Sequence, residues 1–153
     1  MIHRRIKRPK DQDSIYRKLT DRDEFGIFAS YKEVFMIAGT VGFLEKKRKQ
    51  FSATAEGLLW DNFNLDTDEP MINMVALSET QDIDILRDDA ETFDKKLNIF
   101  EEYAAGGIEI IEQVLLEQPK LVVNNYFDFI MSMENDTTEQ ERNLKGIADM
   151  IFN

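Results

Sequence analysis

The feature that most constrains the fold is a run of seven apolar residues spaced at steps of 4, 3, 4, 4, 3 and 4. This spacing places all seven on one face of an α-helix, so it predicts one long amphipathic helix that ends before Pro119. Gly106 and Gly107 each cost such a helix about 1 kcal/mol. Either the helix bends there or a neighbour packs against bare backbone. The seven residues are Phe93, Leu97, Phe100, Ala104, Ile108, Ile111 and Leu115.

Helical patterns extend over most of the remaining chain. Aromatic and small residues share one stripe over residues 28–44, which predicts a helix that another helix approaches closely. The stripe leaves open whether that neighbour belongs to the same chain or to a second copy. Nearer the N-terminus, Asp11 or Asp13 can cap a short helix that follows residues 1–10. That helix carries Ile15, Tyr16 and Leu19.

The second half of the chain adds further helices around an irregular stretch. Pro70 fits the first turn of a helix, and a short turn follows at residues 83–86. Further helices are predicted over residues 121–133 and 144–151, while residues 50–69 are irregular. The fold class predicted is all-α. We expect a single compact domain of about five or six helices over residues 11–153, preceded by a basic N-terminal arm, residues 1–10. There is room for a short β element near residues 50–62.

Composition excludes several kinds of chemistry. The 153 residues contain no cysteine and a single histidine, His3. Thiol catalysis, thiolate zinc sites and disulfides are therefore excluded, and a serine–histidine arrangement has only His3 to draw on. No apolar run reaches the ~20 residues of a membrane span, and the basic start does not lead into an apolar signal core. We expect a cytoplasmic protein.

The charges of the chain are divided unevenly. Residues 1–50 contain 13 Lys or Arg against 7 Asp or Glu, whereas residues 51–153 contain 6 against 23. Such a division is typical of a basic arm for nucleic acid beside an acidic protein-binding surface, and also of two ends that attract each other. Both interpretations stay open at the level of the sequence.

Four runs of residues carry a resemblance to a known family. They are residues 5–10 (RIKRPK), 31–43 (YKEVFMIAGTVGF), 76–80 (ALSET) and 99–107 (IFEEYAAGG). Over roughly residues 4–117 the chain resembles the DNA phosphorothioation-associated protein 4 family, small proteins encoded beside bacterial genes for sulfur modification of the DNA backbone and for restriction. The resemblance implies anti-phage defence and partners that handle DNA. It implies no catalytic residues.

Two basic clusters are the candidate DNA-binding residues. Pro9 keeps the first cluster extended, so that it can lie along a phosphate backbone. The second cluster follows the helix of residues 28–44, where cations also complement a helix C-terminus. The predicted DNA-binding residues are Arg4, Arg5, Lys7, Arg8, Lys10, Lys46, Lys47, Arg48 and Lys49.

The acidic half is the candidate surface for a protein partner. Carboxylates on helices can dock on a basic subunit or mimic DNA in its binding channel. Surplus aromatic residues also favour interfaces. The predicted partner-binding residues are Asp88, Asp89, Glu101, Glu102 and Tyr103.

The function predicted is a non-enzymatic accessory subunit of a bacterial DNA-modification or restriction system, with protein subunits of that system as partners and with DNA or a second partner on the basic arm. One alternative is an acidic regulator that mimics DNA. The other is a metal-dependent nuclease that uses the carboxylates of residues 82–94. No cofactor is predicted, because the chain lacks a Walker loop and a dinucleotide fingerprint, and no metal site is predicted.

Overall fold

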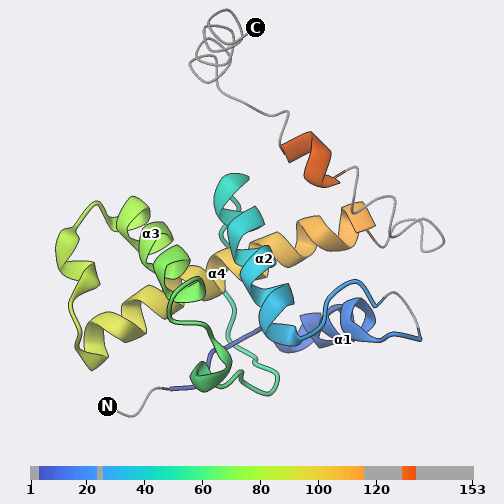
Figure 1. Ribbon diagram of the computed structural model, residues 1–153, viewed down its shortest axis with the longest axis horizontal. Coiled ribbons are helices and arrows are strands. Elements are labelled where there is room, and N and C mark those ends of the chain that lie inside the picture. The colour runs from blue at the N-terminus through green and yellow to red at the C-terminus, as the bar shows by residue number, and fades with distance from the viewer. Residues whose placement is uncertain (1–3, 24–25, 116–128, 134–153) are drawn as a thin grey trace, which may run out of the picture. The chain divides into compact units, whose positions relative to one another are not determined.

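The structure is a computed structural model that describes residues 4–23, 26–115 and 129–133 (Figure 1). The chain divides into two compact units, Met1–Gln113 and Val114–Asn153. Helices dominate the described residues and no strand occurs among them, which confirms the predicted all-α class. In the second unit residues 129–133 are helical, inside the predicted helix of residues 121–133. Residues 144–151 and Pro119 lie outside the described residues. No helix in the described part of the chain could cross a lipid bilayer, given its length and polarity.

The helix predicted from the apolar run is α4 (Ala90–Leu115), and the first unit is built around it. Every residue from 99 to 108 is buried, so this stretch is covered on all sides rather than on one face. In Figure 1, α2 (Tyr31–Leu44) and α3 (Asp68–Thr80) lie across α4. The middle of α4 is therefore the axis of the unit.

Bare backbone lets α2 and α4 cross closely. A Cβ at Gly42 would lie 1.9 Å from the carbonyl oxygen of Tyr103, and a Cβ at Gly107 would lie 1.8 Å from that of Ala38. Neither space admits a side chain. The close approach predicted for residues 28–44 is confirmed, and its partner is a helix of the same chain. Of the two alternatives at the glycine pair of α4, packing of a neighbour is the one observed.

Two predicted helix starts differ from the structure. α2 begins at Tyr31 rather than near residue 28, because the Ser30 hydroxyl accepts a hydrogen bond from the Glu33 amide and caps the helix. α1 (Asp13–Thr20) follows a short 3-10 helix, η1 (Lys10–Gln12). Its N-cap residue is Gln12, without a side-chain cap, so the predicted caps at Asp11 and Asp13 were wrong.

The irregular stretch packs aromatic rings into the core. It contains a 3-10 helix, η2 (Trp60–Asn62), which precedes α3. Trp60 stacks on Phe63 and meets the edge of Phe93, while Phe35 of α2 contacts both Phe63 and Phe100. A further 3-10 helix, η3 (Ile83–Leu86), matches the predicted short turn. Pro70 lies in the first turn of α3, as predicted.

Residues 6–10 of the N-terminal arm pair through their backbone with residues 53–58 of the irregular stretch. The amide of Ile6 donates to the Leu58 carbonyl at 2.8 Å, and the Leu58 amide donates back at 2.9 Å. The Lys10 amide donates to the Ala53 carbonyl at 2.9 Å. These bonds form two isolated antiparallel bridges rather than a named strand. The short β element predicted near residues 50–62 is thus reduced to a ladder with residues 6–10.

Candidate functional site

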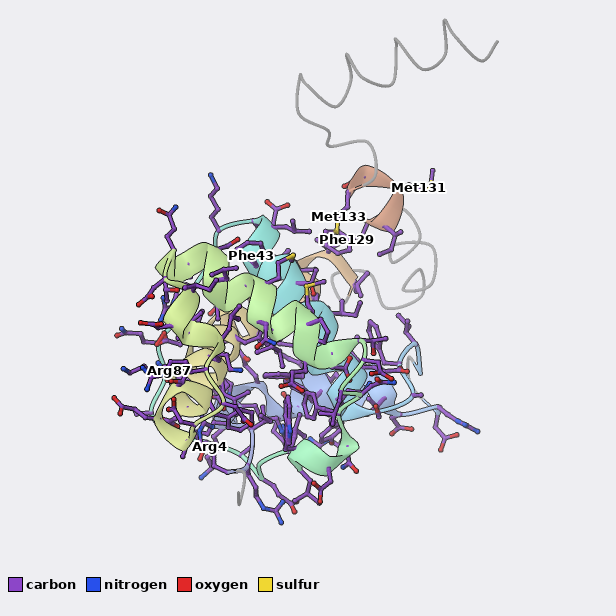
Figure 2. All side chains as sticks on the ribbon, turned by 60° about the vertical axis from the view of Figure 1, so that its left-hand side comes forward. Arg4, Phe43, Arg87, Phe129, Met131 and Met133 are labelled. Atoms are coloured by element: carbon purple, nitrogen blue, oxygen red, sulfur yellow. The ribbon has the colours of Figure 1, made fainter. Side chains whose placement is uncertain are left out.

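Two carboxylates of α4 bind Arg4 of the basic arm, which is labelled in Figure 2. Its two terminal nitrogens donate to the two carboxylate oxygens of Glu101 at 2.7 and 2.8 Å, a bidentate geometry, while Nε donates to Asp94. The backbone amide of Lys7 also donates to Glu101. The buried carboxylate of Glu101 is therefore enclosed by three donors from the arm.

Burial sets the electrostatics of this contact. The Glu101 side chain is 1% exposed. Loss of solvent raises the pKa of its carboxyl, while the charge of Arg4 and the amide of Lys7 act in the opposite direction. Burial also disfavours the charged form of Arg4, but Glu101 and Asp94 outweigh it and raise the pKa of the guanidinium. The pair holds the arm in place rather than presenting a charge to a partner.

Arg8 is buried against two aromatic rings that also contact each other edge-on. Its guanidinium carbon lies 4.9 Å from the ring centre of Tyr16 and 4.7 Å from that of Tyr31. One terminal nitrogen donates to Asp13 at 2.6 Å, and Nε donates to the Glu56 carbonyl at 3.1 Å. The residue is 3% exposed. Two of its three nitrogens thus donate within the chain, and the guanidinium makes cation–π contacts with both rings.

The second basic segment, residues 46–49, leaves α2 through a Schellman motif. The Lys47 amide donates to the Gly42 carbonyl at 2.8 Å, and the Lys46 amide donates to that of Phe43. Lys46 adopts φ 54°, the left-handed conformation that glycine usually supplies at this position. The turn directs the segment along α4, where the Lys49 amide donates to the Glu102 carbonyl at 2.9 Å.

Carboxylates of α3 and α4 pair with three of these four cations. Glu109 accepts from Lys47 at 2.8 Å and from Lys49, and these hydrogen bonds lower its pKa. Arg48 donates to Glu102 at 2.9 Å and to Glu79 at 2.8 Å. Side chains of the three cations remain 33–43% exposed. The segment is bound to the helix and also reaches solvent.

Tyr103 links α4 to α3 beneath Arg48. Its hydroxyl donates to the Glu79 carboxylate, and this bond lowers the pKa of Glu79. Burial, together with Glu79, raises the pKa of the tyrosine to about 12. Of the predicted partner-binding residues, Glu101, Glu102 and Tyr103 are at most 7% exposed. A partner could reach these three only if the unit opened.

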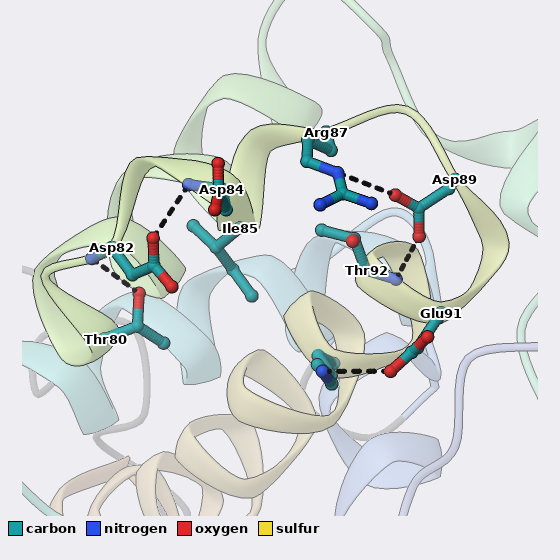
Figure 3. Close-up of a pocket in the computed structure, with 9 residues that line it drawn as sticks. Thr80, Asp82, Asp84, Ile85, Arg87, Asp89, Glu91 and Thr92 are labelled. Carbon is teal, nitrogen blue, oxygen red and sulfur yellow. Dashed lines mark hydrogen bonds and ion pairs between the residues drawn. The ribbon is translucent and has the colours of Figure 1, made fainter.

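The other two predicted partner-binding residues are Asp88 and Asp89, and Asp89 lines a cavity of about 440 Å³ at the start of α4 (Figure 3). Asp89 caps α4: its carboxylate accepts from the Thr92 amide at 2.8 Å, and this bond lowers its pKa. Asp88 is exposed. The cavity is lined mainly by carboxylates, two cations and one isoleucine, namely Asp82, Asp84, Asp89, Glu91, Arg87, Lys95 and Ile85.

The structure thus divides the predicted DNA-binding residues into two groups. Arg4, Lys47, Arg48 and Lys49 form ion pairs, and Arg8 is buried. Four others are exposed and have no ion-pair partner in the part of the chain that the structure describes: Arg5, Lys7, Lys10 and Lys46.

Sequence reasoning missed the carboxylates that accept these cations. Glu79 lies in the run of residues 76–80 but had no predicted role there, and Glu109 belongs to no motif; they pair with residues 31 and 60 positions away. The only signal was their place on helix faces rich in apolar residues. No group of three or more carboxylate or histidine side chains in the described ranges is placed to hold a metal ion.

The fold and these sites define an all-α protein whose charged clusters surround one long central helix. The sequence model of one family matches residues 5–148, nearly the whole chain. The protein belongs to this family, described as DNA sulphur modification system-associated protein 4. No curated protein and no solved structure matches the chain.

Proposed function

We propose that the protein is a non-enzymatic accessory subunit of a bacterial DNA sulphur-modification or restriction system. It docks on a protein subunit through the acidic surface at the start of α4, and its exposed basic residues contact DNA or a second partner. The family membership over residues 5–148 is the observation that carries the proposal. A cytoplasmic location follows from the proposal, since such a system acts on cellular DNA.

Exposed charges of opposite sign support two contacts of different chemistry. Arg5, Lys7 and Lys10 come from the arm, whose backbone is held by the ladder with residues 53–58. The carboxylates of residues 82–91 lie before α4 and in its first turn. A duplex would be repelled by the second group and attracted by the first.

The docking contact is tested by purifying the tagged protein from its native host, with and without nuclease treatment. Recovery of modification or restriction subunits after nuclease treatment would support direct docking. Recovery that nuclease abolishes would mean that DNA forms the bridge. If no such subunit is recovered in either sample, the proposed function is wrong.

The DNA contact is tested with duplex DNA and two matched triple variants. Changing Arg5, Lys7 and Lys10 to alanine removes three exposed cations of the arm, and we expect weaker binding and a flatter dependence of log Kd on log salt, by about 0.9 per lost phosphate contact. The control changes three exposed cations in and after α1 to alanine, namely Arg17, Lys18 and Arg22. Equal losses of DNA affinity in the two triple variants would contradict a specific role of the arm.

Regulation by DNA mimicry is a second candidate, supported by the exposed carboxylates of residues 82–91. It predicts that DNA and this protein compete for the same partner subunit. The nuclease alternative draws no support from the described residues, where the carboxylates of residues 82–94 form no metal-holding group. Magnesium-dependent cleavage of DNA that Asp84→Ala abolishes would be needed to restore it.

A further inference from the structure

η3 presents two apolar side chains to solvent. In a 3-10 helix, side chains three positions apart lie one above the other. Ile83 and Leu86 have this spacing and are 76% and 39% exposed, while Ile85 between them is 7% exposed. One isoleucine therefore anchors η3 to the unit, and the other two apolar residues share its outer side.

The neighbouring helix α3 also has apolar residues on its outer face. Ile72 and Val75 face the core, yet Met74 and Leu77 are 47% and 36% exposed. α3 and η3 pack against each other. Of the eight large hydrophobic residues exposed in the described part of the chain, four lie between residues 74 and 86. Single exposed apolar residues are ordinary on a protein surface, whereas a local group of them is typical of a binding site.

Carboxylates flank the apolar pair on η3 along the chain. Residues 82–91 contain five carboxylates and one arginine, Arg87. Asp82 caps η3 by accepting from the Asp84 amide at 3.0 Å, and Asp89 caps α4. The exposed carboxylates of Asp84 and Asp88 form no hydrogen bond or ion pair with other described side chains.

We propose that the outer surface of η3, centred on Ile83 and Leu86 and bordered by Asp82, Asp84 and Asp88, binds an amphipathic segment of a partner protein that carries Lys or Arg beside its apolar residues. Apolar contact supplies the burial, and the unpaired carboxylates select the cations. Nucleic acid and an anionic lipid surface are disfavoured by the same carboxylates. The proposal rests on the proposed function, which it deepens by locating the docking surface and naming the partner's chemistry.

The adjoining cavity gives a cationic side chain a place to enter. Its volume of about 440 Å³ exceeds that of an arginine side chain, and Figure 3 shows the carboxylates of Asp82, Asp84 and Glu91 around it. Arg87 and Lys95 also line the cavity, each paired with a carboxylate: Arg87 with Asp89 at 3.3 Å and Lys95 with Glu91 at 3.2 Å. An incoming cation would replace or join these exposed pairs.

A photo-crosslinking experiment in the native host tests the surface directly. The photoreactive residue p-benzoylphenylalanine replaces Ile83 in the full chain, and in the control it replaces Leu65, which is 60% exposed in the turn before α3. The crosslinked peptides are identified by mass spectrometry. We expect position 83, and not position 65, to yield an adduct with a Lys- or Arg-rich protein segment. An adduct with a neutral or acidic segment, with nucleic acid or with a second copy of the chain would overturn the proposal, as would the absence of an adduct.

Two double variants then separate the apolar and the ionic parts. Ile83→Ser with Leu86→Ser, and Asp84→Asn with Asp88→Asn, are each expected to weaken binding of the crosslinked segment, made as a synthetic peptide, by about tenfold or more. The matched controls are Leu65→Ser and the pair Asp61→Asn with Asp66→Asn, which change exposed residues elsewhere. Equally large losses of peptide affinity in the control variants would contradict a specific site on η3.

The outcomes also distinguish a failure of the proposed docking surface from a failure of the proposed function. If modification-system subunits co-purify equally well with wild type and with the Ile83→Ser, Leu86→Ser variant, the accessory role stands and the surface is wrong. If position 83 crosslinks to a basic segment of a protein outside such a system, the surface stands and the proposed function is wrong.

Discussion

The two basic segments, residues 4–10 and 46–49, both lie against α4, but they are held in different ways. Arg4 meets a carboxylate that is 1% exposed, whereas Lys47 and Lys49 meet Glu109, which is 35% exposed. Burial raises the pKa of Glu101, and hydrogen bonds lower that of Glu109. Two clusters with similar charge in the sequence therefore have different roles: Arg4 and Arg8 fix the arm to the core, whereas Lys47, Arg48 and Lys49 form a bound but partly exposed surface.

The sharpest test of this difference compares Glu101→Ala with Glu109→Ala. Glu101→Ala leaves Arg4 with Asp94 alone and the Lys7 amide without its acceptor, so we expect the free energy of unfolding to fall by about 3 kcal/mol. Glu109→Ala breaks exposed pairs and is expected to cost less than about 1 kcal/mol. Urea unfolding monitored by circular dichroism measures both. Similar losses in the free energy of unfolding would show that burial does not make the Glu101 contact more stabilising than the Glu109 contact.

A second comparison replaces one arginine of each segment with lysine. Lysine keeps the charge but lacks the planar guanidinium that lies against both Tyr16 and Tyr31 and donates to both Asp13 and the Glu56 carbonyl. We expect Arg8→Lys to lower the free energy of unfolding by about 2 kcal/mol. For Arg48→Lys, whose pairs are partly exposed, we expect less than about 1 kcal/mol. A larger loss at Arg48 than at Arg8 would reverse the assignment of the structural arginine.

Lys46→Gly tests whether the turn into the second segment is strained. Glycine accepts φ 54° more readily than lysine, so the variant is expected to gain about 0.5–1 kcal/mol in the free energy of unfolding. Lys10→Ala in the arm, where the side chain is exposed, is the control and is expected to change stability by less than about 0.5 kcal/mol. No gain in Lys46→Gly would mean that the turn tolerates lysine without cost.

The smallest expected effect is on the pH dependence of stability, to which Glu109 and Glu101 contribute with opposite signs. Glu109 has a lowered pKa in the folded state, so its contribution to stability is present above the ordinary value of 4.5 and is lost as the pH falls through the folded pKa. Glu101 has a raised pKa, so its contribution is present below 4.5 and is lost as the pH rises through the folded pKa.

Unfolding between about pH 6 and pH 3 measures these contributions. Relative to wild type, Glu109→Gln is expected to lose less stability on acidification, and Glu101→Gln is expected to lose more. The differences amount to a few tenths of a kcal/mol for the exposed residue. Parallel profiles for all three proteins would contradict the opposite pKa shifts.

Much of the fold could be predicted because its signals are local. The spacing of apolar residues over 93–115 predicts α4, and Pro70 marks the first turn of α3. The glycines of residues 28–44 predict a close helix crossing, but not with which helix. The N-cap of α2 at Ser30 and the N-cap position of α1 at Gln12 were missed, since several Asp and Ser residues compete as caps within a few positions.

What the sequence by itself determined is the all-α class, the long central helix, the lack of thiol chemistry and the division of charge. Each of these depends on residue types or on periodicity along the chain. The tertiary structure alone decided which charges are buried, which are paired and which remain free. Arg4 and Glu101 are 97 positions apart and Arg48 and Glu102 are 54 apart. Such pairs form only because α4 is enclosed by the arm, α2, α3 and the segment after α2, and burial then changes what the same charge can do.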